Sequence, residues 1–227
     1  MTTDTQWATI RDFSNLRFIE SQMPPTLLHD LNLEIDKLTS NSESYNHRLQ
    51  GHMKEEYSLD HIKGHFENWL LSVSKSWVDA NPGYLDEFEE VLKCNSYNLY
   101  LDNLWVNKQK KHEFNPIHHH SGALSFVIFV KIPYNLKDEL NHFPLISGTS
   151  DEHKDNFYTS KFCFVYNDVL GKIKQLAVPV DETFEGTILM FPSSLLHTVY
   201  PFYTSDDYRI SVSGNIRIRP EGTNEST

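Results

Sequence analysis

The spacing of apolar residues divides the chain into a helical first part and a β second part. After Pro25, a residue type favoured in the first turn of a helix, one apolar set recurs at helical spacing. A second set follows Ser58, a candidate N-cap, and stops before the turn residues 81–83. The two sets are Leu28, Leu31, Ile35 and Leu38, and then Ile62, Phe66, Trp69, Leu70, Val73 and Trp77. The pattern predicts two amphipathic helices whose aromatic residues belong to the core.

From residue 97 onward the apolar period changes to two, which is typical of strands. Six such runs are separated by turn residues: 96–107, 123–133, 161–168, 173–180, 186–192 and 208–218. Short strands after a helical beginning favour a mainly β fold, a sandwich or jelly roll, with the helices packed on one outer face.

One polar segment, residues 134–160, lies between two predicted strands and has no clear period. Structureless connections longer than about 12 to 15 residues are usually functional loops or disorder. Two interpretations stay open, an acidic surface loop and a lid over a substrate.

Size and composition predict a single domain. The chain has 227 residues, of which 39% are hydrophobic, enough for one sizeable core. We expect this domain to span residues 1–220, with a helical prelude over about 20–95 and a β core over about 96–218. The polar residues 221–227 are expected to be a frayed tail.

The charge balance narrows the classes of partner. A net charge of -11, from 20 basic and 31 acidic residues, repels a phosphate backbone, so no nucleic-acid partner is expected. No stretch resembles a leader or a membrane span, and two cysteines, Cys94 and Cys163, cannot form a disulfide framework. The expected location is the cytoplasm, and no oligomeric state is predicted.

Three consecutive histidines precede the second predicted strand. If residues 118–120 are extended, His118 and His120 point to one face and His119 to the other. A third ligand must come from elsewhere, and His197, just after the buried run 186–192, is the best candidate. Imidazole suits iron, copper, nickel and zinc alike. The alternative is that these histidines are ordinary hydrogen-bonded residues.

A polar row lies on the last predicted strand, where Arg209, Ser211, Ser213 and Asn215 share one face. An inward guanidinium is a planar fork suited to a carboxylate, and the hydroxyl groups can add hydrogen bonds. The alternative is a structural arginine paired with Asp206, Asp207 or another acid.

These pieces resemble the Fe(II)- and 2-oxoglutarate-dependent oxygenases. The matching stretches are LWVNKQKKHEFNPIHHHSGALSFVIFVKIP, GTILMFPSSLLHTVYPF and YRISVSGNI, with a weaker match in YNHRLQGHMKEEYSL. The likeness is greatest to a group of oxygenases, similar to prolyl 4-hydroxylases, that is common in marine (T4-like) phages; a phage protein would act in the host cytoplasm. The resemblance implies a double-stranded β-helix, the cupin-like jelly roll.

The resemblance also implies a role for each site residue. His118 matches the first metal ligand of the superfamily, His197 the distal ligand, and Arg209 the clamp on the far carboxylate of 2-oxoglutarate. Further residues expected at the co-substrate slot are Ser211, Ser213, Asn107, Ser125, Val127 and Phe129, with Lys131 as a competitor of Arg209.

Position 120 departs from the superfamily pattern, which usually has a carboxylate there. A neutral imidazole removes one negative charge from the ligand set but leaves the ligand geometry possible. Three options follow. In the first, which we favour, His120 is a true third ligand of the metal. In the second, His120 lies outside the coordination sphere, which a water or a remote acid completes, and in the third the protein has lost the metal.

The implied enzyme is a non-haem Fe(II) dioxygenase that uses 2-oxoglutarate and O2, hydroxylates an unactivated C–H bond and releases succinate and CO2. Its substrate would be a small molecule or a peptide, with peptidyl proline as the leading candidate. Two alternatives remain: a three-histidine cupin-type dioxygenase without 2-oxoglutarate, and a catalytically silent jelly-roll binding module.

Overall fold

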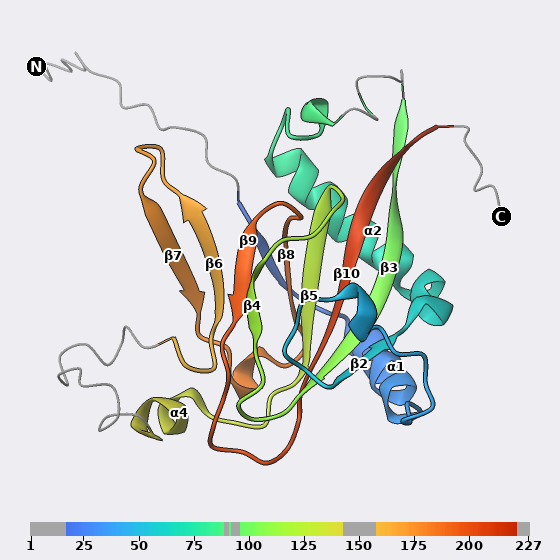
Figure 1. Cartoon of the computed structure of the whole chain (residues 1–227). Coiled ribbons are helices and arrows are strands. Elements are labelled where there is room, and N and C mark those ends of the chain that lie inside the picture. The colour runs from blue at the N-terminus through green and yellow to red at the C-terminus, as the bar shows by residue number, and fades with distance from the viewer. Residues whose placement is uncertain (1–16, 89–90, 92–95, 143–157, 222–227) are drawn as a thin grey trace, which may run out of the picture.

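The structure is a computed structural model that describes residues 17–88, 91, 96–142 and 158–221. Within these residues, two antiparallel sheets face each other as a double-stranded β-helix (Figure 1). The larger sheet has the order β1-β8-β5-β10-β3-β2, and the smaller has the order β4-β9-β6-β7. The fold is therefore the mainly β jelly roll that the sequence predicts.

The strands of the larger sheet are β1 (Ile19–Gln22), β2 (Glu55–Ser58), β3 (Tyr97–Gln109), β5 (Leu124–Lys131), β8 (Thr187–Pro192) and β10 (Arg209–Pro220). Those of the smaller sheet are β4 (Asn115–His118), β6 (Phe162–Asn167), β7 (Ile173–Val178) and β9 (Leu196–Val199). All six predicted strands are confirmed as β3, β5, β6, β7, β8 and β10. The other four have only four residues each, too few for an alternating pattern to be distinctive.

Two helices, α1 (Pro25–Asp36) and α2 (Lys63–Ala80), cover the outer face of the larger sheet (Figure 1). The apolar face of α2 packs against the sheet, with buried Phe66, Leu70 and Trp77 in the same core cluster as Phe126 of β5. This packing confirms the predicted helical layer on one face.

The predicted cap of the second helix is wrong. Ser58 is the last residue of β2, and its hydroxyl oxygen accepts a hydrogen bond at 3.3 Å from the backbone N–H of Asp60 in a short 3-10 turn. The α-helix begins only at Lys63. The serine therefore starts a turn, a role that its side chain fills as readily as a helix cap.

The segment 134–160 is not structureless at its start, because α4 (Leu136–His142) forms there. The fully buried carboxylate of Glu139 accepts hydrogen bonds from the backbone N–H groups of Tyr203 and Thr204 and from the Thr204 hydroxyl. Residues 143–157, and with them most of the proposed lid, lie outside the described residues, as do Cys94 and the tail residues 222–227. In the described part of the chain, no helix combines the length and the apolar character that crossing a membrane requires.

Candidate metal centre

Two of the candidate ligands, 79 positions apart in sequence, are direct partners in the smaller sheet. Strand β4 pairs antiparallel with β9, and the register places His118 opposite His197. Side chains of directly opposed residues project to the same face of a sheet. The pairing therefore brings both imidazoles to the inner face, where their ring centroids lie 4.3 Å apart.

The third histidine approaches from a loop. Strand β4 ends at His118, so the expectation that His118 and His120 alternate along one strand is wrong. The backbone N–H of His120 instead donates to Ser193 O at 2.9 Å, which anchors the loop beside the end of β8. Gly122 then turns the chain into β5 with a φ of 114° and lies so close to β10 that a Cβ would meet Ile216 O at 2.9 Å.

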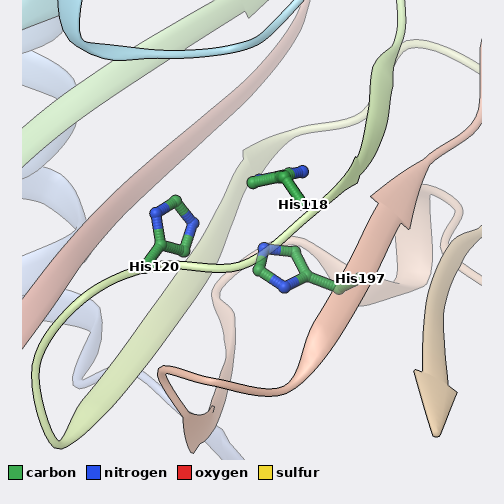
Figure 2. Close-up of side chains that lie close together, drawn as sticks. All are labelled: His118, His120 and His197. Carbon is green, nitrogen blue, oxygen red and sulfur yellow. The ribbon is translucent and has the colours of Figure 1, made fainter.

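Although His120 lies in a loop and not on the strand that the sequence predicts, the rings of the three histidines converge (Figure 2). One nitrogen from each of His118, His120 and His197 can be chosen so that all three lie within 4.8 Å of one another. The ring of His120 lies 5.0 Å and 5.1 Å, between centroids, from the other two. His119 is exposed at the rim of the same cavity and does not belong to the cluster.

The protonation of the cluster suits a metal ion. The Nδ1 atom of His118 lies 2.7 Å from Pro116 O, and that of His197 lies 2.9 Å from Leu195 O. Since a carbonyl oxygen only accepts, both Nδ1 atoms carry the proton, and both Nε2 atoms keep a free lone pair. Burial lowers the pKa of all three imidazoles, to about 3 for His120, so that they are neutral ligands at physiological pH.

A cavity extends from the histidines to a polar wall on the larger sheet. Asn107 of β3 donates through Nδ2 to the hydroxyl oxygens of Ser211 and Ser213 of β10, each at 3.4 Å. Neither hydroxyl donates a hydrogen bond in turn within the described part of the chain. Both can therefore donate to an acidic ligand in the cavity.

Comparison with protein families decides the class. Residues 103–215, about half of the chain, match a family model described as "Putative 2OG-Fe(II) oxygenase", where 2OG is 2-oxoglutarate. The match begins in β3 and ends in β10, and so contains the three histidines and the polar wall. The chain belongs to the 2OG-Fe(II) oxygenases.

A comparison with curated proteins finds no significant match. Among solved structures, a Pseudomonas putida prolyl-4-hydroxylase is 12% identical and has a TM-score of 0.46. The match covers 90% of this chain and 93% of the chain of the hydroxylase. The epimerase SnoN from nogalamycin biosynthesis is 13% identical, with a TM-score of 0.49 and coverages of 91% and 82%. HygX from Streptomyces hygroscopicus, solved with nickel and 2-oxoglutarate, is 11% identical, with a TM-score of 0.49 and coverages of 92% and 84%. At these scores the likenesses indicate no particular reaction for this oxygenase.

Fe(II) and 2-oxoglutarate are the metal and co-substrate of this family, and the residues of this chain fit both. Three neutral imidazoles with free lone pairs suit the metal, and the free hydroxyl donors suit a carboxylate. Phe162 and Phe191 pack against the His197 ring, at centroid distances of 5.6 Å and 4.9 Å, and shield the metal side of the cavity from water.

Arg209 of the oxygenase does not line the cavity. It is buried, and its guanidinium makes five hydrogen bonds, two to Gln109 Oε1 and one each to Tyr134 Oη, Ser160 O and Tyr200 O. Gln109 stands between the guanidinium and the cavity. Asp206 and Asp207 pair with Lys111 and Lys131 instead, so the predicted alternative pairing of Arg209 with either acid is wrong.

Three further predicted slot residues lie elsewhere. Phe129 is buried in the apolar core, outside the cavity lining. The Ser125 side chain is buried outside the cavity lining, where its hydroxyl bonds to Ser193 Oγ at 2.9 Å and Asn215 Oδ1 at 2.7 Å. Lys131 is exposed and pairs with Asp207 at 2.6 Å. All three are corrections, because alternation along a strand predicts the face of a side chain but not its distance from the cavity.

Residues that the sequence analysis did not single out form the remaining wall. The segment 45–53 lies between α1 and β2 and contributes four residues to the cavity lining: Arg48, Leu49, Gln50 and Met53. Tyr45 stacks on Trp105 at a centroid distance of 5.3 Å, and the Arg48 guanidinium lies over the Tyr45 ring. The weak family likeness of YNHRLQGHMKEEYSL was the available signal, but the stretch has no periodic pattern.

Proposed function

We propose that this oxygenase hydroxylates an unactivated C–H bond, with His118, His120 and His197 as the three ligands of its Fe(II). The observation that carries the proposal is the set of three neutral imidazoles at one cavity, opposite a wall of free hydroxyl donors. Bound Fe(II) and 2-oxoglutarate supply the oxidising chemistry with O2, and the co-substrate leaves as succinate and CO2.

The chain's own residues bind and orient the reactants. The backbone carbonyls of Pro116 and Leu195 hold the imidazoles of His118 and His197 with Nε2 free for the metal. Ser211 and Ser213 donate to the far carboxylate of 2-oxoglutarate, and Asn107 orients both hydroxyls.

For Arg209 we propose an indirect role. Its charge lies one layer behind the wall and favours an anion in the cavity, while Gln109, which accepts two of its hydrogen bonds, lies between the guanidinium and the cavity. A direct clamp on the carboxylate would require Gln109 to move aside.

The test is an anaerobic titration of the Fe(II)-loaded protein with 2-oxoglutarate, followed through the weak visible charge-transfer band of the chelated keto acid. The band should rise to saturation in the parent and in Ser72→Ala, a control on the exposed face of α2. It should require at least about tenfold more 2-oxoglutarate in the double variant Ser211→Ala and Ser213→Ala, with Fe(II) affinity unchanged. Unchanged 2-oxoglutarate affinity in the double variant would remove the proposed role of the wall.

A second candidate is a three-histidine dioxygenase that binds its substrate directly and needs no 2-oxoglutarate. The absence of an acidic residue from the cavity lining, in the described part of the chain, is what favours it. Iron binding without the band would support this candidate, and failure to bind iron would support a silent binding module.

The first substrate class to test is a peptidyl proline. The resemblance of the sequence to prolyl 4-hydroxylases is the one reason for this choice. Succinate formation that depends on an added proline-containing peptide would support it, and formation that is independent of the peptide would not.

A further inference from the structure

One residue, Ser193, holds the loop 119–123, which carries the third histidine and leads into β5 (Figure 2). Ser193 directly follows β8. Its backbone oxygen accepts from the His120 N–H at 2.9 Å, and its own N–H donates to Ala123 O at 3.2 Å. Its hydroxyl oxygen lies 3.6 Å from the position that a Cβ would take at Gly122. The backbone position of His120 therefore depends on where Ser193 lies.

The His120 ring depends on this backbone anchor more than the other two rings do. His118 and His197 lie on paired strands, and each ring is fixed by a backbone carbonyl two residues earlier. Within the part of the chain that the structure describes, the His120 ring makes no hydrogen bond and packs beside Trp105, with the ring centroids 5.6 Å apart. A shift of the loop would move this ring away from the other two.

The Ser193 hydroxyl is bonded in turn to buried polar side chains of the larger sheet. Ser125 Oγ lies 2.9 Å from Ser193 Oγ and 2.7 Å from Asn215 Oδ1. Asn215 Nδ2 donates to Asn103 Oδ1 at 2.9 Å. Because Asn215 Oδ1 only accepts, it takes the hydrogen of Ser125, and the hydrogen between the two serines comes from Ser193. These four residues, Ser193, Ser125, Asn215 and Asn103, are called the Asn–Ser network.

The Asn–Ser network crosses the larger sheet from strand to strand. The register places Asn215 of β10 opposite Ser125 of β5 on one side and opposite Asn103 of β3 on the other. With Ser193 at the end of β8, the network spans the adjacent strands β8, β5, β10 and β3. At its far end Asn103 Nδ2 donates to the Asp102 carboxylate at 3.2 Å, which fixes the direction of each hydrogen bond along the network.

Burying these polar groups has a cost that apolar residues would avoid. Ser193, Ser125 and Asn215 are 0%, 1% and 6% exposed, and their side-chain polar atoms are all bonded. Apolar side chains would fill the same space without any polar group to desolvate. A buried network whose members are all satisfied instead specifies one arrangement of the groups that it joins. In this protein the group at its end is Ser193, and through it the backbone of His120.

We propose that the Asn–Ser network positions His120 for metal binding, with Ser125 and Asn215 acting through Ser193. The inference rests on the proposed function, in which His120 is the third ligand. Ser125 and Asn215 are positioning residues, because neither lines the cavity and neither belongs to the histidine cluster. A ligand held by a loop needs such support, and loss of outer-shell partners typically costs about 10- to 100-fold in metal affinity.

The first test measures amide hydrogen exchange by NMR on the full metal-free chain. Ser125→Ala removes the link between Ser193 and Asn215, so the His120 amide should exchange at least about tenfold faster through local opening of the loop. The Leu70 amide, within α2, reports on the protein as a whole and should change much less. Ser125→Thr keeps the hydroxyl and should match the parent. Ser74→Ala removes a buried hydroxyl outside the network and should also leave the His120 amide unchanged.

A second variant keeps this test decisive if Ser125→Ala folds poorly. Asn215→Ala interrupts the network on the other side of Ser125 and should cause the same selective acceleration at His120. An unchanged His120 amide in either folded variant would overturn the proposal. Equal acceleration of the His120 and Leu70 amides would overturn it too, because a general loss of stability would then explain both.

The second test is a double-mutant cycle on Fe(II) affinity, measured anaerobically with a chelating indicator. Ser125→Ala should weaken Fe(II) binding by about tenfold, the scale of outer-shell losses. In the His120→Ala background the same substitution should cause no further loss, because the network then has no ligand to position. A merely structural role would weaken binding in both backgrounds. Equal losses in the two backgrounds, or no loss in either, would overturn the proposal.

The two tests also separate this inference from the proposed function. If the parent binds no Fe(II), the proposed function fails, while the His120 amide still shows whether the network fixes the loop. If the parent binds Fe(II) and the His120 amide alone accelerates, unchanged Fe(II) affinity in Ser125→Ala would show that the network fixes the loop without positioning a ligand.

Discussion

Buried polar groups of the jelly roll use their hydrogen-bonding capacity in opposite ways in two regions: the surroundings of Arg209 and Glu139, called here the closed end, and the surroundings of the cavity, called the open end. At the closed end, Arg209 makes five hydrogen bonds to the protein, and Glu139 nearby accepts from two backbone N–H groups and a hydroxyl. At the open end, the Ser211 and Ser213 hydroxyls and Glu56 Oε1 keep unused bonding capacity. Satisfied groups stabilise one fold, whereas unsatisfied groups are available to ligands. Substitutions at the closed end should therefore cost stability, and those at the open end should cost binding.

The largest effect should come from Arg209→Ala at the closed end. Removing the guanidinium leaves the buried acceptors Gln109, Tyr134 and Ser160 without their donor, so the free energy of unfolding should fall by about 3–5 kcal/mol. Urea denaturation measures the change, with Arg48→Ala, an exposed arginine, as the control. A stable Arg209→Ala protein that binds Fe(II) but not 2-oxoglutarate would restore the direct carboxylate clamp.

The second effect belongs to the open end. His197→Ala should weaken Fe(II) binding by more than about 100-fold, beyond the 10- to 100-fold loss typical of outer-shell partners. In the metal-free protein, His197→Ala should lower the free energy of unfolding much less than Arg209→Ala does. Competition with a chelating indicator measures the affinity, and His112→Ala, an exposed histidine outside the cluster, should match the parent. Equal losses in the two variants would exclude His197 as a ligand.

The third effect concerns pH and stability. Burial and the nearby acid Glu113 raise the folded pKa of Glu56 to about 7 from its ordinary value of 4.5, so between these pH values the unfolded chain ionises first and the folded protein loses stability as pH rises. Glu56→Gln should remove this loss and be more stable than the parent by about 1–2 kcal/mol at pH 8, with no such gain at pH 4. Urea unfolding at both pH values tests the sign; Glu55→Gln, on the same strand, should retain the parental trend. A gain of equal size at both pH values would rule out the titration of Glu56 as its cause.

The smallest effect tests the ligand that departs from the superfamily pattern. His120→Asp should tighten Fe(II) binding, because it restores a negative charge to the ligand set, whereas His120→Ala should weaken binding by about 10-fold. Both affinities are measured with the same chelating indicator. Two variants that bind like the parent would show that His120 is not a ligand.

The local pattern predicted what depends on local interactions. Periodicity located the six longer strands and both major helices, because each buries one face and repeats its apolar residues accordingly. It could not locate β4 and β9, which are four residues long and hold His118 and His197. The pairing of these histidines follows from a β4–β9 register that joins residues far apart in the chain.

The sequence by itself therefore determined the mainly β class, the outer helices, the candidate ligands and, through its family motifs, the oxygenase identity. Only the tertiary structure decided which polar residues reach the cavity. Arg209 and Ser125 lie on the predicted strands, yet their hydrogen bonds are used within the protein, whereas Glu56 reaches the interior from an edge strand without a distinctive pattern. The physical reason is that a strand pattern specifies a face, while the availability of a polar atom depends on every neighbour that the fold brings to it.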